Sequence, residues 1–171
     1  MKTRRPVNSD VRWLTLTMEV DEYLRLKVDP SSDGTGKLTA TIAAGGFAAS
    51  GEAYFNLRSL AEFSQQLRAF PLSESDPPHI EGGFWSKEKR GVIEQVHLSI
   101  RAYQIGSKGQ VGVRVTCADP PLWPNDRKES QNSATIELMS SYSALARFAN
   151  EIDLLLESKL EEAVFRGERL P

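Results

Sequence analysis

The chain has 171 residues, of which 40% are hydrophobic and 26% are charged. These proportions are typical of one globular domain with its own core, here expected to span residues 1–171, and they exclude a disordered chain. The formal net charge of −2 argues against a protein that coats nucleic acid or anionic lipid. No apolar run approaches the roughly 20 residues that cross a bilayer. We therefore expect a cytoplasmic protein without nucleic-acid or membrane partners.

Alternation of apolar and polar residues predicts a series of antiparallel strands with one face on the core. The predicted strands are residues 12–20, 23–28, 38–44, 47–55, 92–103, 111–117 and 135–139. Gly45-Gly46 can supply the positive φ angles of a two-residue hairpin turn between two of them. Residues 72–89 and 119–132 are rich in proline, glycine and charged residues, and we expect them to form two long loops.

Two amphipathic helices are predicted at a constant spacing along the chain. Asn56 and Ser141 are good N-cap residues, because their side-chain oxygen can accept a free N–H of the first helical turn. The first helix is expected to end at Pro71, with Phe70 on its apolar side, and the second to include Ala163. The apolar positions Leu60, Ala61, Phe63 and Leu67 of the first helix match Leu145, Ala146, Phe148 and Ile152 of the second.

These elements predict an α+β protein with two helices on one face of a largely antiparallel, twisted sheet of about seven or eight strands. The alternative is a closed or sandwich-like sheet with the helices at its edge. The matching helices also predict a duplicated strand-then-helix unit, with halves at residues 11–71 and 78–165. The match can also arise by chance, because amphipathic helices draw on few residue types.

The sequence has no phosphate-binding loop, dinucleotide-binding fingerprint, nucleophile elbow or zinc-protease motif. His79 and His97 show no spacing typical of a zinc site, and we expect both at the surface. Cys117 falls on the apolar side of its strand, so we expect a buried cysteine rather than a nucleophile. No catalytic residue, metal or cofactor is therefore predicted, although an enzymatic activity is left open.

The polar face of the hairpin that turns at residues 106–109 carries candidate partner-binding side chains. If the residues flanking the turn pair with each other, Arg101 lies opposite Arg114, with Tyr103 and His97 beside them. Like charges directly across two strands are unfavourable unless an anion lies between them. We therefore hypothesise a surface that binds an acidic partner.

The arginine pair is also compatible with a surface that binds nothing. A nearby carboxylate, Glu52 or Glu94, can neutralise the two charges, or both side chains can extend into solvent.

The two long loops add Trp85 and Trp123 as candidate partner contacts, because aromatic residues on loops often contact partners. The alternative is that both tryptophans pack onto the sheet. Leu154 and Phe165 lie off the apolar stripe of the second helix, and they suggest either a homodimer contact or two apolar residues tolerated at the surface.

The layout around the first helix is a strand that runs into a helix of regular apolar spacing. It is carried by Tyr54-Phe55-Asn56-Leu57, Leu60, Phe63, Leu67 and Phe70-Pro71, with a second copy at Leu145 to Ile152. This layout resembles small bacterial α+β proteins related to the WapI-type immunity proteins of contact-dependent toxin systems. The resemblance implies a protein that binds a cognate toxin through a variable surface, so it assigns no binding residue. The net charge of −2 departs from the strongly acidic balance of many toxin-neutralising proteins.

We predict a non-enzymatic bacterial protein-binding module of unknown partner, with an immunity protein as one candidate. The alternative is a binder of a small molecule or carbohydrate, or an enzyme. Its cleft would be lined by Trp85, Trp123, Tyr103, Arg101 and Arg114.

Overall fold

A computed structural model describes residues 21–120 and 131–168, which form eight strands and two helices. The strands are β1 (Tyr23–Pro30), β2 (Thr35–Ala44), β3 (Phe47–Asn56), β4 (His79–Trp85), β5 (Ile93–Ile105), β6 (Gln110–Ala118), β7 (Ser133–Ser141) and β8 (Ala163–Arg166). The helices are α1 (Leu57–Gln66) and α2 (Tyr142–Leu156). The strand predicted at residues 12–20 and the candidate Trp123 lie outside the described residues.

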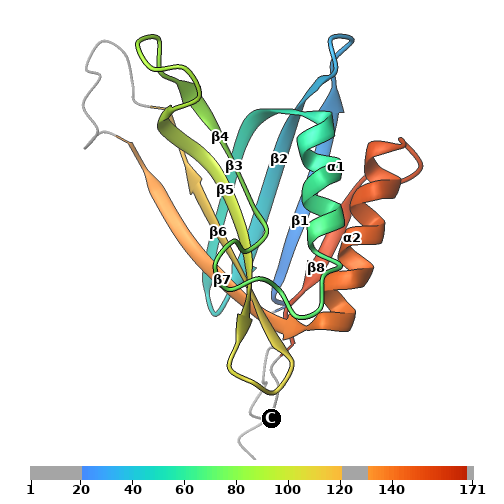
Figure 1. Cartoon of the computed structure of the whole chain (residues 1–171). Helices are drawn as coiled ribbons and strands as arrows, with labels where there is room; N and C mark the ends of the chain where they lie inside the picture. Colours follow the sequence, from blue (N-terminus) through green and yellow to red (C-terminus); the bar gives the residue numbers. More distant parts are fainter. Residues whose placement is uncertain (1–20, 121–130, 169–171) are drawn as a thin grey trace, which may run out of the picture.

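The strands divide between two antiparallel four-stranded sheets (Figure 1). Sheet A has the order β3-β2-β1-β8, and sheet B has the order β7-β6-β5-β4. The α+β class and the number of strands are confirmed, whereas a single sheet is wrong and the sandwich-like alternative applies. In sheet A, β1, β2 and β3 are joined by β8, which follows α2. In sheet B, β5, β6 and β7 are joined by β4, which follows α1. This repeated order is what a duplication would produce, although the duplication itself stays a prediction.

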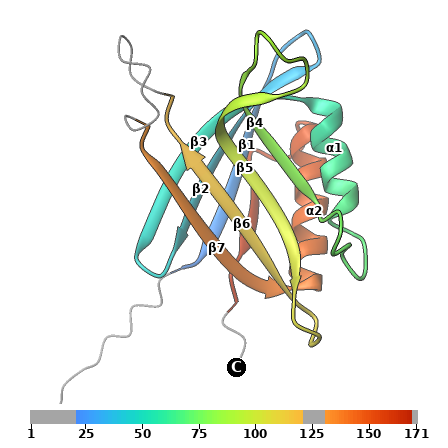
Figure 2. The same ribbon diagram turned by 60° about the vertical axis from the view of Figure 1, so that its left-hand side comes forward.

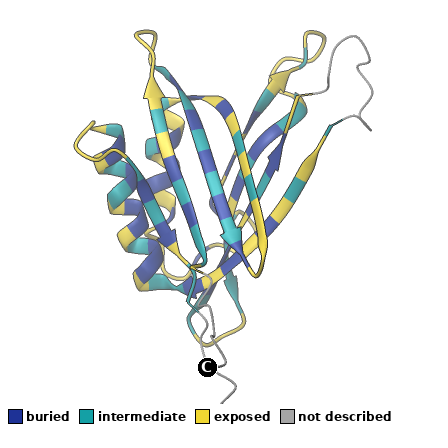
Figure 3. Cartoon of the chain, turned by 180° about the vertical axis from the view of Figure 1, so that it is seen from behind, coloured by how far each residue is buried: buried dark blue, intermediate teal, exposed yellow. Residues whose placement is uncertain are grey.

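The core lies between the two sheets, because alternate residues of each strand point inward. Figure 3 shows the resulting bands of buried and exposed residues along the strands. Leu24 and Ile42 from sheet A and Leu98 and Val115 from sheet B are all fully buried. Burying one such side chain contributes about 1.5–3 kcal/mol, so the paired apolar faces supply the main stabilisation of the fold.

The two helices run side by side along one flank of the molecule (Figure 2). Both predicted caps are confirmed, since Asn56 accepts the N–H of Arg58 and Ser141 accepts the N–H of Ala144. Helix α1 contacts β3 and β4, and α2 contacts β1, β6, β7 and β8. Each helix therefore touches both sheets and closes the opening between them.

Both helices are shorter than the sequence predicts. Helix α1 ends at Gln66, and Phe70 is 78% exposed instead of buried on its apolar side. Helix α2 ends at Leu156, and Ala163 belongs to β8 rather than to the helix. Pairing of residues 163–166 with β1 gives this segment the backbone bonds that a longer helix would have supplied.

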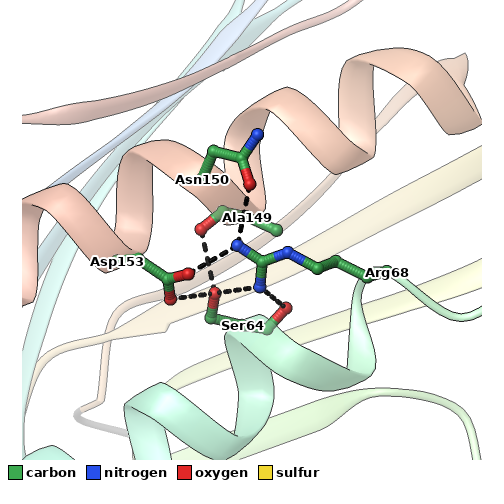
Figure 4. Close-up of polar contacts among 5 residues, drawn as sticks. All are labelled: Ser64, Arg68, Ala149, Asn150 and Asp153. Carbon is green, nitrogen blue, oxygen red and sulfur yellow. Dashed lines mark hydrogen bonds and ion pairs between the residues drawn. The ribbon is translucent and has the colours of Figure 1, made fainter.

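A polar cluster of Ser64, Arg68, Asn150 and Asp153 joins the two helices (Figure 4). The buried Ser64 hydroxyl lies 2.9 Å from the carbonyl oxygen of Ala149 and 2.6 Å from the Asp153 carboxylate. The Arg68 guanidinium binds Asp153 and donates to Asn150 at 2.8 Å. Polar groups that are removed from water between helices need such partners.

The cluster also joins positions that lie at a constant offset in the sequence. Ser64 and Ala149 are 85 residues apart, as are Arg68 and Asp153, and this offset also relates the matching apolar residues of α1 and α2. Contacts between equivalent positions are expected where an approximate two-fold axis passes between two elements. These two contacts are therefore of the kind that a duplicated unit predicts.

The sheets approach closely where β3 crosses sheet B. A Cβ atom at Gly51 would lie 2.9 Å from Cys117 Cβ and 3.1 Å from the His97 carbonyl oxygen. A Cβ atom at Gly82 would lie 2.8 Å from the Phe55 ring. Both glycines allow backbone and side chains of opposite sheets to meet at distances that any larger residue would prevent.

We expect the Gly51→Ala variant to lower the free energy of unfolding by about 1–3 kcal/mol, because the added methyl overpacks the contact with Cys117. Urea unfolding followed by circular dichroism measures the loss. Ser50→Thr is the matched control, since it adds a methyl to the exposed neighbouring residue. Equal stability of the two variants would contradict the role assigned to Gly51.

We expect Arg68 and Asp153 to be coupled by about 1–2 kcal/mol in a double-mutant cycle of alanine variants, because they belong to one connected polar cluster. The control cycle is the exposed pair Arg58–Glu62, for which about 0.3–0.5 kcal/mol is expected. Similar coupling in both cycles would mean that the cluster adds no more than a surface ion pair.

Candidate functional site

The outer face of sheet B carries one cross-strand row of charged and polar side chains. Arg101 of β5 pairs with Arg114 of β6, which confirms the register predicted from the turn. His79 of β4 lies on the other side of Arg101, and Glu137 of β7 lies on the other side of Arg114. The row His79–Arg101–Arg114–Glu137 therefore crosses all four strands, because residues directly opposite each other on antiparallel strands point to the same face of the sheet.

The two arginines of the row differ in their partners. Arg114 forms an ion pair with Glu137 at 3.2 Å. Arg101 has no hydrogen-bond or ion-pair partner among the residues that the structure describes. Glu137 thus neutralises Arg114 alone, and Glu52 is not the partner of either arginine, because it binds Lys37 at 3.3 Å. One guanidinium remains available to an anionic group.

Tyr103 lies beside the row and supports it. The Arg114 guanidinium lies 5.6 Å from the centre of the Tyr103 ring, a cation–π contact. A Cβ atom at Gly112 would lie 2.8 Å from this ring, so the ring rests across the glycine. The Tyr103 hydroxyl has no hydrogen-bond partner within the described part of the chain. The ring therefore limits where the Arg114 side chain can lie.

A groove of about 490 Å³ lies beside this face, between the end of β3, the start of α1 and strand β4. Its lining residues are Thr35, Tyr54, Phe55, Asn56, Ser59, His79, Ile80, Glu81 and Trp85. Trp85 is the last residue of β4 and is 55% exposed, so its predicted position in a loop is wrong. His79 belongs to both the groove and the charged row, and its ring lies 3.1 Å from the Ser99 hydroxyl.

His97 is buried, contrary to the surface position predicted for it. It is 6% exposed, and its ring meets Phe84 edge-on at 4.5 Å. Burial lowers the pKa of His97 from 6.5, because the charged form loses water, and the charge of Asp119 opposes this shift. The side chain is therefore shielded from a partner at the arginine row.

Cys117 is buried as predicted, and burial raises its pKa to about 11. Only a small fraction of this thiol is ionised near neutral pH, so it lacks the thiolate that nucleophilic catalysis requires. Across residues 21–120 and 131–168, no group of three or more His, Cys, Asp or Glu side chains could hold a metal ion.

The predicted dimer residues do not share a surface. Phe165 lies in β8 and is 1% exposed, with its ring 5.5 Å from that of Phe148. Leu154 of α2 is 40% exposed. A homodimer contact through Phe165 is therefore wrong, and a contact through Leu154 stays a prediction.

Sequence reasoning missed Tyr54, His79 and Glu81 of the groove. The signal was present in β4, where His79 and Glu81 are exposed and Ile80 and Gly82 are buried. The alternation is short, because it is interrupted at Gly82-Gly83 and again between Phe84 and Trp85, where the register with β5 shifts. The sequence therefore predicts a loop at this strand.

Comparison of the chain with family models, curated proteins and solved structures finds no match. No helix in the described part of the chain is long and apolar enough to span a membrane. We therefore infer function from the geometry of the arginine row and the groove.

We expect the free energy of unfolding to fall as the pH is lowered below 6.5, in part because of His97. Its pKa is lower in the folded state than in the unfolded state, so the unfolded chain binds a proton first as the pH falls. This difference lowers the free energy of unfolding by at most about 1.4 kcal/mol per pH unit. Above pH 6.5 this contribution is fully present. The His97→Asn variant should show a shallower slope in urea unfolding, whereas His79→Asn should keep the slope due to His97. An unchanged slope in His97→Asn would contradict the assignment.

Proposed function

We propose that this protein is a non-enzymatic binding module that holds an acidic segment of a partner protein on the outer face of sheet B. Arg101 and Arg114 are the contacts for the partner's carboxylates. The observation that carries the proposal is the pairing of these arginines across β5 and β6, with a carboxylate beside Arg114 alone. An incoming carboxylate beside Arg101 would relieve the repulsion between two like charges.

The shape of the site supports a macromolecular partner. Arg101 and Arg114 project from a row that crosses a four-stranded sheet, and both are exposed. Ligand pockets for small molecules are concave and bury most of the ligand surface, whereas protein interfaces are broad and enriched in arginine and aromatic residues. The exposed arginines of the row, with the Tyr103 ring beside Arg114, fit the description of a protein interface.

A toxin is one candidate for the partner, on the basis of the resemblance to WapI-type immunity proteins. Co-expression of the chain with a toxin encoded beside its gene would test this role. Loss of protection when both arginines are replaced would tie the role to the row.

A second candidate function is the binding of a small molecule. It is supported by the groove, which brings Trp85 together with Tyr54, His79 and Glu81. This set differs from the predicted cleft, because Arg101, Arg114 and Tyr103 lie on the sheet face and do not line the groove.

We expect the tagged protein to capture one stoichiometric partner from the lysate of its native cells, and Arg101→Ala/Arg114→Ala to weaken this binding at least tenfold. Each hydrogen bond to a charged group contributes about 1.5–3 kcal/mol, which corresponds to such a loss. Arg147→Ala is the control, since Arg147 is an exposed arginine on α2 with one ion pair to Glu168. Equal capture by the double variant and the control would refute the proposal.

A further inference from the structure

Each half of the fold has one place where the edge strands of the two sheets lie next to each other, and we call these places seams. The first seam, between β3 and β4, contains the groove, and the second lies between β7 and β8, which occupy the matching positions in the strand orders. The chain itself closes that second seam. After β8, the N–H of Gly167 donates to the Glu22 carbonyl oxygen at 2.8 Å, and the N–H of Glu168 donates to the Met139 carbonyl oxygen of β7 at 2.8 Å. The Glu151 carboxylate of α2 also accepts the N–H of Val164 in β8 at 2.7 Å.

The first seam begins in the same way and then stays open. The N–H of Ser86, which follows β4, donates to the Val92 carbonyl oxygen at 2.8 Å, as Gly167 does to Glu22. The chain then turns back toward β5, and the Ser86 hydroxyl accepts the N–H groups of Glu88 and Lys89. Tyr54 is the residue that corresponds to Met139, and within the described chain no bond like that from Glu168 reaches it.

The open seam exposes two aromatic rings around one carboxylate. Tyr54 is 65% exposed and Trp85 is 55% exposed, although both line the groove. The Glu81 carboxylate lies 3.7 Å from the His79 ring, and none of the described residues that line the groove is a lysine or arginine. The faces of aromatic rings are negative, and a carboxylate is fully charged, so the lining favours a positive ligand.

From this lining and the open seam, we infer that the groove binds an organic cation of the alkylammonium class. The cation lies against Trp85 and Tyr54, and the Glu81 carboxylate neutralises it. The rings can hold methylated or alkylated nitrogen, which sheds its water more readily than a metal ion does. The side chains of Asn56 and Ser59 offer an amide and a hydroxyl to polar groups carried by the same ligand.

This inference rests on the second candidate function, the binding of a small molecule in the groove, and it is independent of the function proposed for the arginine row. The groove requires Tyr54, Glu81 and Trp85, whereas the row requires Arg101 and Arg114. Failure of one leaves the other standing, because the variants that test them do not overlap.

The test compares choline with 3,3-dimethylbutan-1-ol, a neutral molecule of the same shape, by titration of the isotope-labelled full chain in NMR. We expect choline to bind at least tenfold more tightly and to shift the indole N–H signal of Trp85. Glu81→Gln should remove most of the difference between the two probes, and Trp85→Ala should weaken choline binding at least tenfold.

Two matched variants control for charge and for aromatic surface. Glu88→Gln removes an exposed carboxylate from the neighbouring hairpin, and Phe47→Ala removes a ring that is 73% exposed at the turn between β2 and β3. Both should bind choline like the native protein. Equal affinity for choline and the neutral probe, unchanged affinity in Glu81→Gln, or no saturable shift in a folded protein would overturn the inference.

Discussion

The close contact at Gly51 is the constraint on which the arrangement of the two sheets depends. Strand β3 reaches the backbone of β5 and β6 there, because residue 51 carries no side chain between the strand and Cys117. Gly82 allows a similar contact between β4 and Phe55. The sheets thus meet along β3, and the opening on their other flank has to be covered. Helices α1 and α2 cover it, and each contacts both sheets.

Positions 85 residues apart in the sequence meet where the two helices pack. Ser64 of α1 contacts Ala149 of α2, and Arg68, which follows the end of α1, contacts Asp153. The small residues Ser64 and Ala149 let the two helix backbones approach each other. At the edge of this contact, Arg68 and Asp153 neutralise each other's charge. The correspondence between the two halves ends at the seams, where Glu168 closes one and the turn at Ser86 leaves the other open. Both candidate sites lie on surfaces that this packing leaves uncovered: the outer face of sheet B and the open seam.

Much of the arginine row could be predicted from the sequence, whereas most of the groove could not. The turn at residues 106–109 determines the pairing of β5 with β6, because a short hairpin loop allows few registers. The sequence therefore predicts that Arg101 lies opposite Arg114. Glu137 was missed as the partner of Arg114, since β7 reaches β6 through a long connection whose register no local signal reveals. The groove joins β3 and α1 to β4, which are separated by a segment without periodic pattern.

The sequence by itself determined the local features of this protein: the alternation of the strands, the caps at Asn56 and Ser141, the burial of Cys117 and the register of the long hairpin. These depend on residues close together in the chain, whose spacing and backbone preferences act over a few bonds. Only the tertiary structure decided that the strands form two sheets, that residues 163–166 leave the second helix to pair with β1, and that His97 is buried. Each of these outcomes depends on contacts between distant segments, where a missing side chain at Gly51 or a free strand edge at β1 outweighs the local pattern.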